Sequence, residues 1–183
     1  MKIFVNDTNI LIDLADLDLL EAFSKLDALL YTTDLIVAEI SDAIEKTKIQ
    51  SLIDREILKV IPLKAEEFNA VFSIKEDNSG LSFEDCSVWF LADKYQGTLV
   101  TGDGNLRKQA TRKGTEVKGI LYLFDEFVKN ALLDHETARD KLILLKEINP
   151  GCRKKRSTNG SVSGKNNHSN WKALDERMSG MGL

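Results

Sequence analysis

The chain alternates short runs of apolar residues with longer segments in which apolar positions recur every three or four residues. Continuous runs are typical of strands buried on both faces, whereas the wider spacing is typical of helices that bury one side. The predicted strands span residues 3–5, 29–32, 58–61, 98–100 and a short segment near 116–118. The predicted helices span residues 9–20, 35–44, 65–75, 82–95, a segment after Gly104 that runs to about Lys113, 120–132 and 135–147.

Residues at the ends of these segments support the same division. Asp34 is expected to cap the helix that follows it, and Pro62 ends the third strand. Ser82 and Asp85 have the spacing of a capping box at the start of the helix 82–95. Strands that alternate with helices predict an α/β fold with a mostly parallel sheet, and ligands of such sheets bind beyond the carboxyl ends of the strands.

The composition changes after Pro150. Residues 151–183 begin with a basic run at 153–156 and continue with a stretch rich in Ser, Asn and Gly, which is too polar to bury a core of its own. We therefore expect a folded domain over residues 1–150 and a flexible basic tail over residues 151–183. The basic run is expected either to touch RNA or to be a solvated cluster of charge.

Charge is distributed unevenly along the chain. Residues 151–183 carry seven Lys or Arg and two Asp or Glu, a net charge of +5, whereas the whole chain carries −4. Residues 1–150 therefore carry −9. Such an acidic body binds nucleic acid poorly, because the phosphate backbone is recognised mainly by Lys and Arg. A nuclease of this composition has to concentrate its acids at a metal site or supply positive charge locally.

The sequence argues against several classes of protein. Its 43% hydrophobic and 30% charged residues are normal for a globular domain, and no apolar run approaches the ~20 residues that span a bilayer. The run at 3–5 is too short for a signal-peptide core, so we expect a cytoplasmic protein. Cys86 and Cys152 lack CxxC spacing and the chain has only two histidines, so no structural zinc site is expected. Cys86 is expected to be a small buried residue.

Two aspartates, Asp7 and Asp103, come just past predicted strands. Because the carboxyl ends of parallel strands meet at one edge of a sheet, both could face one crevice. The alternative is that each is a turn or capping residue, since aspartate is common at such positions. Asn105 could cap the helix after Gly104, which would leave Asp103 less needed for that role.

A third acid, Glu39, lies on a predicted helix. The residues three and four positions away are Leu35, Ile36 and Ala43, all apolar. A carboxylate on such a face is expected to be partly buried and to need a partner or a cation. The alternative is a side chain that reaches solvent or pairs with a lysine, but no Lys or Arg lies within one turn.

The fourth acid, Asp85, has a strong structural explanation as the partner of Ser82 in the capping box. It also shares a helical face with Trp89 and Ala92, which places it at the margin of the core. Its neighbour Glu84 is expected to point elsewhere, into solvent. Together, four separated acids suit a hard cation such as Mg²⁺, which prefers oxygen ligands and keeps several waters.

The segments around these acids resemble the PIN-domain family. They are Val-Asn-Asp-Thr-Asn-Ile-Leu-Ile-Asp at 5–13, Val-Ala-Glu-Ile at 37–40, Leu-Ser-Phe-Glu-Asp-Cys-Ser at 81–87 and Leu-Val-Thr-Gly-Asp-Gly-Asn-Leu-Arg at 99–107. The four occur in the family's order and cover roughly residues 1–130. Each motif alone is a weak signal, whereas the ordered set is fairly specific.

The resemblance implies a three-layer α/β/α sandwich with a sheet of four to five strands. It implies that the catalytic and metal-binding residues are Asp7, Glu39, Asp85 and Asp103. It further implies that Thr8, Asn9, Thr101 and Asn105 orient the carboxylates or a water. Some relatives carry an aspartate at the position of Asn105, so this chain has one acid fewer than they do.

The activity implied by the resemblance is hydrolysis of RNA by an endoribonuclease that uses Mg²⁺ or Mn²⁺. Many bacterial members of this size resemble VapC toxins, whose RNA cleavage stops translation. For this chain the resemblance therefore implies an RNA substrate, a small antitoxin protein as partner in a toxin–antitoxin system, a homodimer and no membrane association.

Three other interpretations compete with a PIN nuclease. A haloacid-dehalogenase-type phosphatase needs Asp-x-Asp after the first strand, where this chain has Asp7-Thr8-Asn9. A response-regulator receiver needs a lysine after a late strand, and the sequence offers no convincing one. A non-catalytic RNA-binding or protein-interaction domain would differ from a nuclease in its lack of metal binding.

Overall fold

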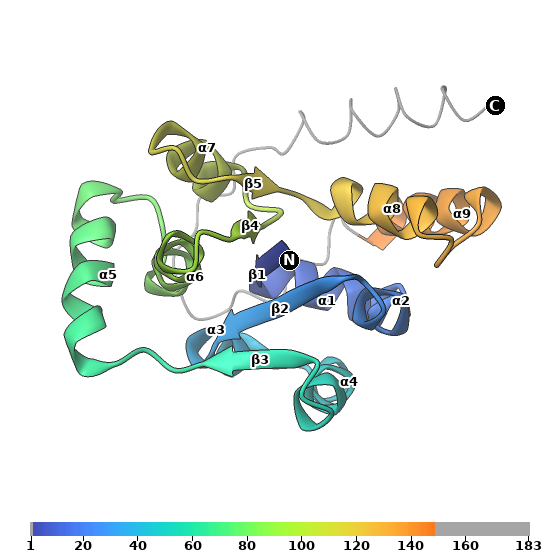
Figure 1. Cartoon of the computed structure of the whole chain (residues 1–183), viewed down its shortest axis with the longest axis horizontal. Helices are drawn as coiled ribbons and strands as arrows, with labels where there is room; N and C mark the ends of the chain where they lie inside the picture. The colour runs from blue at the N-terminus through green and yellow to red at the C-terminus, as the bar shows by residue number, and fades with distance from the viewer. Residues whose placement is uncertain (1, 149–183) are drawn as a thin grey trace.

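Residues 2–148, the part of the chain that this computed structural model describes, build one parallel sheet with helices on both sides (Figure 1). The strands are β1 (Lys2–Asn6), β2 (Ala28–Thr33), β3 (Leu58–Ile61), β4 (Thr98–Val100) and β5 (Val117–Lys118). They pair in the order β3-β2-β1-β4-β5, and each neighbouring pair is parallel. The predicted α/β fold and its sheet of four to five strands are confirmed, and each strand end lies within one residue of its predicted position.

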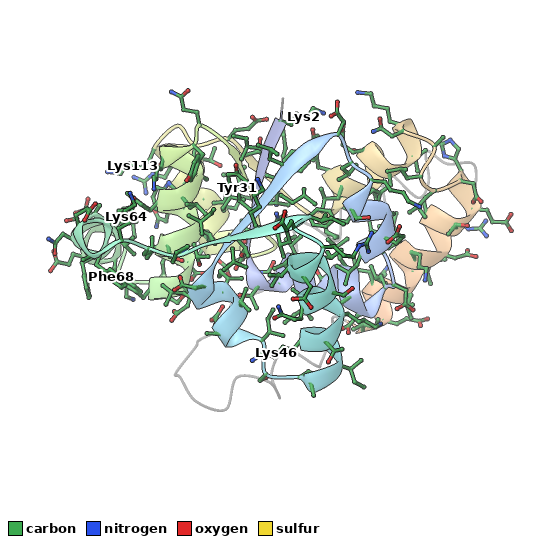
Figure 2. The ribbon with its side chains drawn as sticks, turned by 60° about the horizontal axis from the view of Figure 1, so that its bottom comes forward. Lys2, Tyr31, Lys46, Lys64, Phe68 and Lys113 are labelled. Carbon is green, nitrogen blue, oxygen red and sulfur yellow. The ribbon has the colours of Figure 1, made fainter. Side chains whose placement is uncertain are left out.

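Helices cover both faces of the sheet, which gives the three layers expected. They are α1 (Thr8–Asp16), α2 (Leu20–Ser24), α3 (Asp34–Glu39), α4 (Ala43–Asp54), α5 (Ala65–Asp77), α6 (Phe83–Lys94), α7 (Gly104–Arg112), α8 (Ile120–Lys129) and α9 (His135–Ile148). In Figure 1, α5, α6 and α7 lie on one side of the sheet, and α1, α2 and α4 lie on the other. The outermost helix, α5, carries Phe68 (labelled in Figure 2) and packs on α6, where the ring of Phe83 stacks on that of Phe68 with centroids 5.9 Å apart.

The direction in which the chain adds strands reverses at β1. After β1 the chain builds β2 and β3 on one side, and it then returns to place β4 and β5 on the other. Asn6 pairs with Val100, so the carboxyl ends of β1 and β4 lie side by side. The amide of Asp7 donates to the Val100 carbonyl at 3.1 Å, which extends this contact one residue beyond the strands. Such a reversal opens a crevice at the strand ends, and parallel sheets commonly bind ligands there.

Apolar side chains are buried on both faces of the central strands. Phe4, Val5, Leu30 and Leu99 are each at most 2% exposed, as expected for continuous apolar runs. Cys86 on α6 is a buried free thiol, which confirms the interpretation of this residue as part of the core. None of the described helices is long and apolar enough to cross a membrane.

The predicted helix 9–20 is interrupted in the structure. α1 ends at Asp16, and Asp18 has a φ of 53°, a left-handed conformation that breaks the helix before α2 begins at Leu20. Leu17 and Leu19 are nevertheless both buried, so the apolar pattern continues through the break. Periodicity therefore gives no sign of the interruption.

The predicted helix 35–44 is wrong in its second half. α3 ends at Glu39, because Ile40 leaves the helical conformation with φ −71° and ψ 104°. Asp42 then starts α4 by accepting hydrogen bonds from the amides of Ile44 and Glu45 at 2.9 and 3.1 Å. The sequence pattern does not reveal α4, since that helix buries few apolar residues and Ile44 is 70% exposed.

Two predicted helix caps are also corrected, and one is confirmed. The cap of α3 is Thr33 rather than Asp34, because the Thr33 hydroxyl accepts from the Ile36 amide at 3.3 Å. Asp103 caps α7 itself, so Asn105 does not take that role. The capping box of Ser82 and Asp85 is present as predicted. The predicted tail, including its basic run at 153–156, lies outside the described residues.

Candidate active site

Asp7 lies at the carboxyl end of β1 and is buried, with 3% of its surface exposed. Its Oδ1 accepts a hydrogen bond from the Thr8 amide at 2.7 Å. Its Oδ2 accepts from Asn9 Nδ2 and from the Thr101 hydroxyl, both at 2.6 Å. These three donors fix the orientation of the carboxylate, because two come from the start of α1 and the third comes from the residue after β4.

The residues that hold Asp7 also join the two strand ends to each other. Asn9 Oδ1 accepts from the Gly102 amide at 2.7 Å, which ties the start of α1 to the loop after β4. The Thr101 hydroxyl accepts from the Asp103 amide at 3.0 Å while donating to Asp7. Asn9 and Thr101 both contact the Asp7 carboxylate, although Asp7 and Thr101 are 94 residues apart in the sequence.

Asp103 and Asp85 both sit in the first turn of a helix, where part of each carboxylate has a structural role. Asp103 Oδ1 accepts from the Leu106 amide at 2.7 Å, and Asp85 Oδ2 accepts from the Ser82 amide at 2.8 Å. The other oxygen of each carboxylate accepts no hydrogen bond from the described residues. Each aspartate can thus cap its helix and still offer one oxygen to a ligand.

Glu39 is the last residue of α3, and as a whole it is exposed rather than partly buried as predicted. The early end of α3 explains the difference, since Ala43 belongs to α4 and cannot cover Glu39 one turn later. The Thr8 hydroxyl donates to Glu39 Oε2, which draws the carboxylate towards Asp7. Thr8 thus contacts two of the acids, through its amide to Asp7 and its hydroxyl to Glu39.

The carboxylates are close enough to disturb one another's protonation. Burial first, and then the negative charges of Asp85 and Glu39, raise the pKa of Asp7 to about 7, against the hydrogen bonds from Thr101 and Thr8 that lower it. Burial is likewise the first cause of the raised pKa of Asp85, followed by the charge of Asp103. These effects connect the four acids pair by pair at the carboxyl edge of the sheet, where the reversal of strand order places the crevice.

Glu84 lies near Glu39 and Asp85, and it is half-buried where the sequence predicted a side chain in solvent. The pKa of Glu39 is raised first by partial burial of its carboxylate, although the residue as a whole is exposed, and then by the negative charge of Glu84. The charge of Glu84 also raises the pKa of Asp85. Glu84 is itself only half-buried. Helical spacing alone separates Glu84 from Asp85 by about 100°, so the sequence gives no sign that α3 faces both residues.

Whether these residues fit a divalent cation depends on distance and on donor chemistry. Within residues 2–148, no three His, Cys, Asp or Glu side chains stand close enough together to hold a metal ion in this arrangement. The donor chemistry fits a hard cation, however, since carboxylate oxygens of Glu39, Asp85 and Asp103 remain open. These open carboxylate oxygens suit a cation that keeps several bound waters and contacts some of the carboxylates through those waters.

Asn105 and Arg107, on α7, support the loops rather than the carboxylates. Asn105 Nδ2 donates to the Gly80 carbonyl at 3.0 Å, which ties the first turn of α7 to the loop before α6. Arg107 is half-buried and its Nη2 donates to the Thr101 carbonyl at 2.9 Å. Arg107 is not among the residues predicted from the sequence, although its place in the motif after Asp103 is a signal for it.

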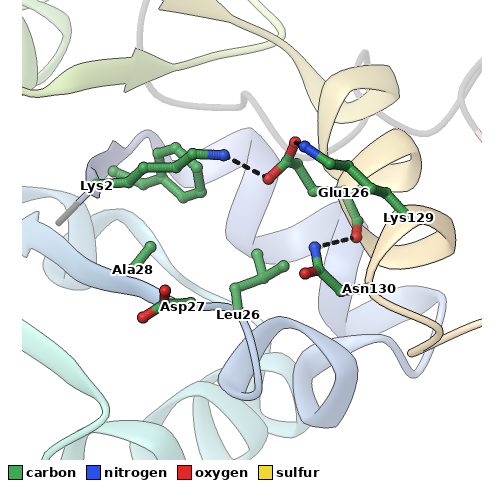
Figure 3. Close-up of a pocket in the computed structure, with 8 residues that line it drawn as sticks. Lys2, Leu26, Asp27, Ala28, Glu126, Lys129 and Asn130 are labelled. Carbon is green, nitrogen blue, oxygen red and sulfur yellow. Dashed lines mark hydrogen bonds and ion pairs between the residues drawn. The ribbon is translucent and has the colours of Figure 1, made fainter.

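A hollow at the opposite edge of the sheet provides a comparison (Figure 3). Its lining includes Lys2, Glu126, Lys129 and Asn130. Glu126 binds Lys2 at 2.6 Å and also lies 3.9 Å from Lys129, so its charge is compensated. The acids at the carboxyl edge instead raise one another's pKa, which makes that edge the better candidate for a cation site.

One comparison with known proteins, a match to a family model, agrees with the fold described above. A family model described as a PIN domain (DUF3368) matches residues 3–159. Among solved structures, the chain is similar to "A domain of a functionally unknown protein from Methanocaldococcus jannaschii DSM 2661", with a TM-score of 0.45 and 21% sequence identity. That match covers 65% of this chain and 91% of the other. The search of curated proteins found no match.

Proposed function

The chain belongs to the PIN-domain family, and from this premise we propose that it is an endoribonuclease that hydrolyses RNA with Mg²⁺ or Mn²⁺. The observation that carries the proposal is the cluster of carboxylates at the reversal of strand order, where burial and mutual repulsion raise the pKa of Asp7 to about 7. Such a cluster weakens the apo protein unless a cation compensates it, and functional sites often carry this kind of cost.

In this proposal Asp7, Glu39, Asp85 and Asp103 hold the cation. When bound, such a cation polarises the scissile phosphodiester and lowers the pKa of an attacking water. The contribution of Thr101 and Asn9 is to keep Asp7 in one orientation through two 2.6 Å hydrogen bonds. Thr8 does the same for Glu39. Fixed carboxylates favour cation binding, because the side chains lose little freedom when the ligand arrives.

We also propose that the nuclease is the toxin of a toxin–antitoxin pair, as the VapC-like motifs imply. Its partners would then be a small antitoxin protein and a second copy of the chain. What supports this part is the resemblance of the four acidic segments alone. A short neighbouring gene whose product copurifies with this protein and suppresses its RNA cleavage would support it, and the absence of any such gene would contradict it.

A second candidate is a non-catalytic PIN-like domain that binds RNA or protein. The observation in its favour is that the acids of the described chain do not stand within common reach of one ion. Calorimetry with millimolar Mg²⁺ and Mn²⁺ discriminates the two candidates. The nuclease proposal requires heat of binding and RNA cleavage that EDTA abolishes, whereas the second candidate predicts neither.

A further inference from the structure

Positive charge is concentrated on α7, in a body that is otherwise acidic. The segment 104–115 contains four cations, Arg107, Lys108, Arg112 and Lys113, and no acid. Residues 1–150 as a whole carry a net charge of −9. A nucleic acid can approach such a body only where local charge is positive, because phosphates are neutralised mainly by Lys and Arg.

Of these four cations, Arg107 is half-buried, whereas the other three project away from the buried side of the helix. Leu106 and Ala110 are fully buried against the sheet, whereas Lys108 and Arg112 are exposed. Lys108 and Arg112 are four residues apart, so they share one face and lie about 6 Å apart along the axis. Lys113 follows them at the end of the helix and projects outwards in Figure 2.

These cations are not neutralised by the protein as most others are. Lys108 makes no hydrogen bond or ion pair with residues 2–148, and Arg112 contacts only the neutral side chain of Gln109, at 3.4 Å. Lys113 has one loose pair, 4.0 Å from Asp77. By contrast, Lys48 and Lys94 bind acids at 2.6 and 2.5 Å. The charge of α7 therefore remains open to an external anion.

The position of α7 connects this charge to the acidic crevice. The helix begins at Asp103, one of the four carboxylates, and runs away from it beside β5 (Figure 1). Arg112 therefore lies about 13 Å along the axis from Asp103. A nucleic acid with one phosphate at the crevice can therefore reach Lys108 and Arg112 with phosphates a few nucleotides away.

We propose that the exposed face of α7, formed by Lys108, Arg112 and Lys113, binds the phosphate backbone of a single-stranded RNA next to the acidic crevice. The proposal rests on the proposed nuclease function and assigns the part of this chain that supplies positive charge. Binding through phosphates is independent of base sequence and depends strongly on salt.

Titration of a fluorescein-labelled oligouridylate of about 20 nucleotides in EDTA tests this proposal without cleavage. The test variant is Lys108→Ala/Arg112→Ala. The matched control is Lys25→Ala/Arg55→Ala, which also removes one Lys and one Arg, both exposed and both paired with Glu21. Lys25 and Arg55 precede β2 and β3, so they lie at the opposite edge of the sheet from the acids.

The test variant is expected to bind the RNA about 20-fold more weakly at 0.1 M salt, with the slope of log K against log salt reduced by about 1.4. The control variant is expected to keep the wild-type slope. Equal slopes in the two variants, or no RNA binding by the wild type, would overturn the proposal. So would polyglutamate binding as tight as RNA binding, since it would assign the face to an acidic protein.

Addition of Mg²⁺ or Mn²⁺ to the same proteins separates this inference from the nuclease function. If RNA binding depends on Lys108 and Arg112 but no cleavage occurs, the assignment of the α7 face holds and the proposed nuclease function is contradicted. If the test variant cleaves RNA with an unchanged KM and salt dependence, the nuclease function is supported and the role of the α7 face in RNA binding is contradicted.

Discussion

The hydroxyl of Thr101 donates a 2.6 Å hydrogen bond to Oδ2 of Asp7, across the carboxyl ends of two adjacent strands. The hydroxyl oxygen of Thr101 also accepts a hydrogen bond from the Asp103 amide, so this one buried side chain connects two of the acids. Because Thr101 is fully buried, this link is shielded from competing water. The arrangement makes the orientation of Asp7 depend on the loop after β4.

Thr101→Val tests this link, because valine keeps the shape of threonine and removes the hydroxyl. The change removes one of the three donors to the Asp7 carboxylate and the acceptor of the Asp103 amide, so the protein should lose about 1–3 kcal/mol of unfolding free energy. Metal affinity, measured by calorimetry with Mn²⁺, should fall by about 10- to 100-fold. Thr101→Ser retains the hydroxyl and is expected to keep most of the affinity. Equal affinities for the valine and serine variants would show that the hydroxyl is not needed.

The raised pKa of Asp7 predicts an unusual dependence of stability on pH. The folded protein holds this proton up to a pKa of about 7, whereas the unfolded chain releases it near 4. The folded state therefore binds more protons between these values, so stability in EDTA should fall as pH rises from about 4 to about 7. The contribution of Asp7 to the free energy of unfolding is fully present below about pH 4 and is lost above about pH 7. This contribution amounts to at most about 4 kcal/mol.

Thermal unfolding of the wild type and Asp7→Asn between about pH 4.5 and 7.5 measures this contribution. Asparagine has no proton to lose, so the midpoint of the variant should decline less over the range. Saturating Mg²⁺ should also flatten the wild-type curve, because a cation favours the ionised carboxylate. Parallel curves for the two proteins in EDTA would mean that Asp7 ionises normally.

Arg107 provides a prediction about support of the Thr101 loop. A Cβ at Gly119 would collide with the Arg107 guanidinium, so Gly119→Ala should push it off the Thr101 carbonyl without removing its charge. We expect the free energy of unfolding to fall by about 1 kcal/mol, which lowers the Tm by a few degrees, and we expect RNA cleavage to be weaker.

Gly80→Ala is the matched control for that experiment. Its Cβ would meet Asn105 Nδ2 at 2.7 Å, another flexible side chain, but one that does not touch the carboxylates. This variant should lose a similar amount of stability and keep its cleavage rate per folded molecule. Equal losses of cleavage in the Gly119 and Gly80 variants would remove the special role of Arg107.

The sequence predicted the sheet well because its strands are continuous apolar runs that pack on both faces, as Phe4 and Leu99 do. It did not predict α4, because that helix is specified largely by the cap at Asp42 rather than by an apolar stripe. Of the candidate site, Asp7 and Asp103 follow from their places after strands in a parallel sheet. The nearness of Glu84 to Glu39 does not follow, since it depends on the packing of α3 against α6.

The dual role of Asp103 sharpens the test of the whole account. As a cap, Asp103 stabilises α7, but asparagine caps helices about as well as aspartate. As a member of the crevice, Asp103 raises the pKa of Asp85 by its charge. Asp103→Asn therefore keeps the cap and removes only the repulsion, which separates the metal site from the structural role.

The most direct measurement is the thermal unfolding of the wild type and Asp103→Asn, each in EDTA and in millimolar Mg²⁺. The account predicts that the variant is as stable as the wild type or more stable in EDTA, and that it loses RNA cleavage. It also predicts a smaller rise in Tm on addition of Mg²⁺, because binding to the folded state stabilises by mass action. Equal Mg²⁺-induced rises in the two proteins would contradict the four-carboxylate site.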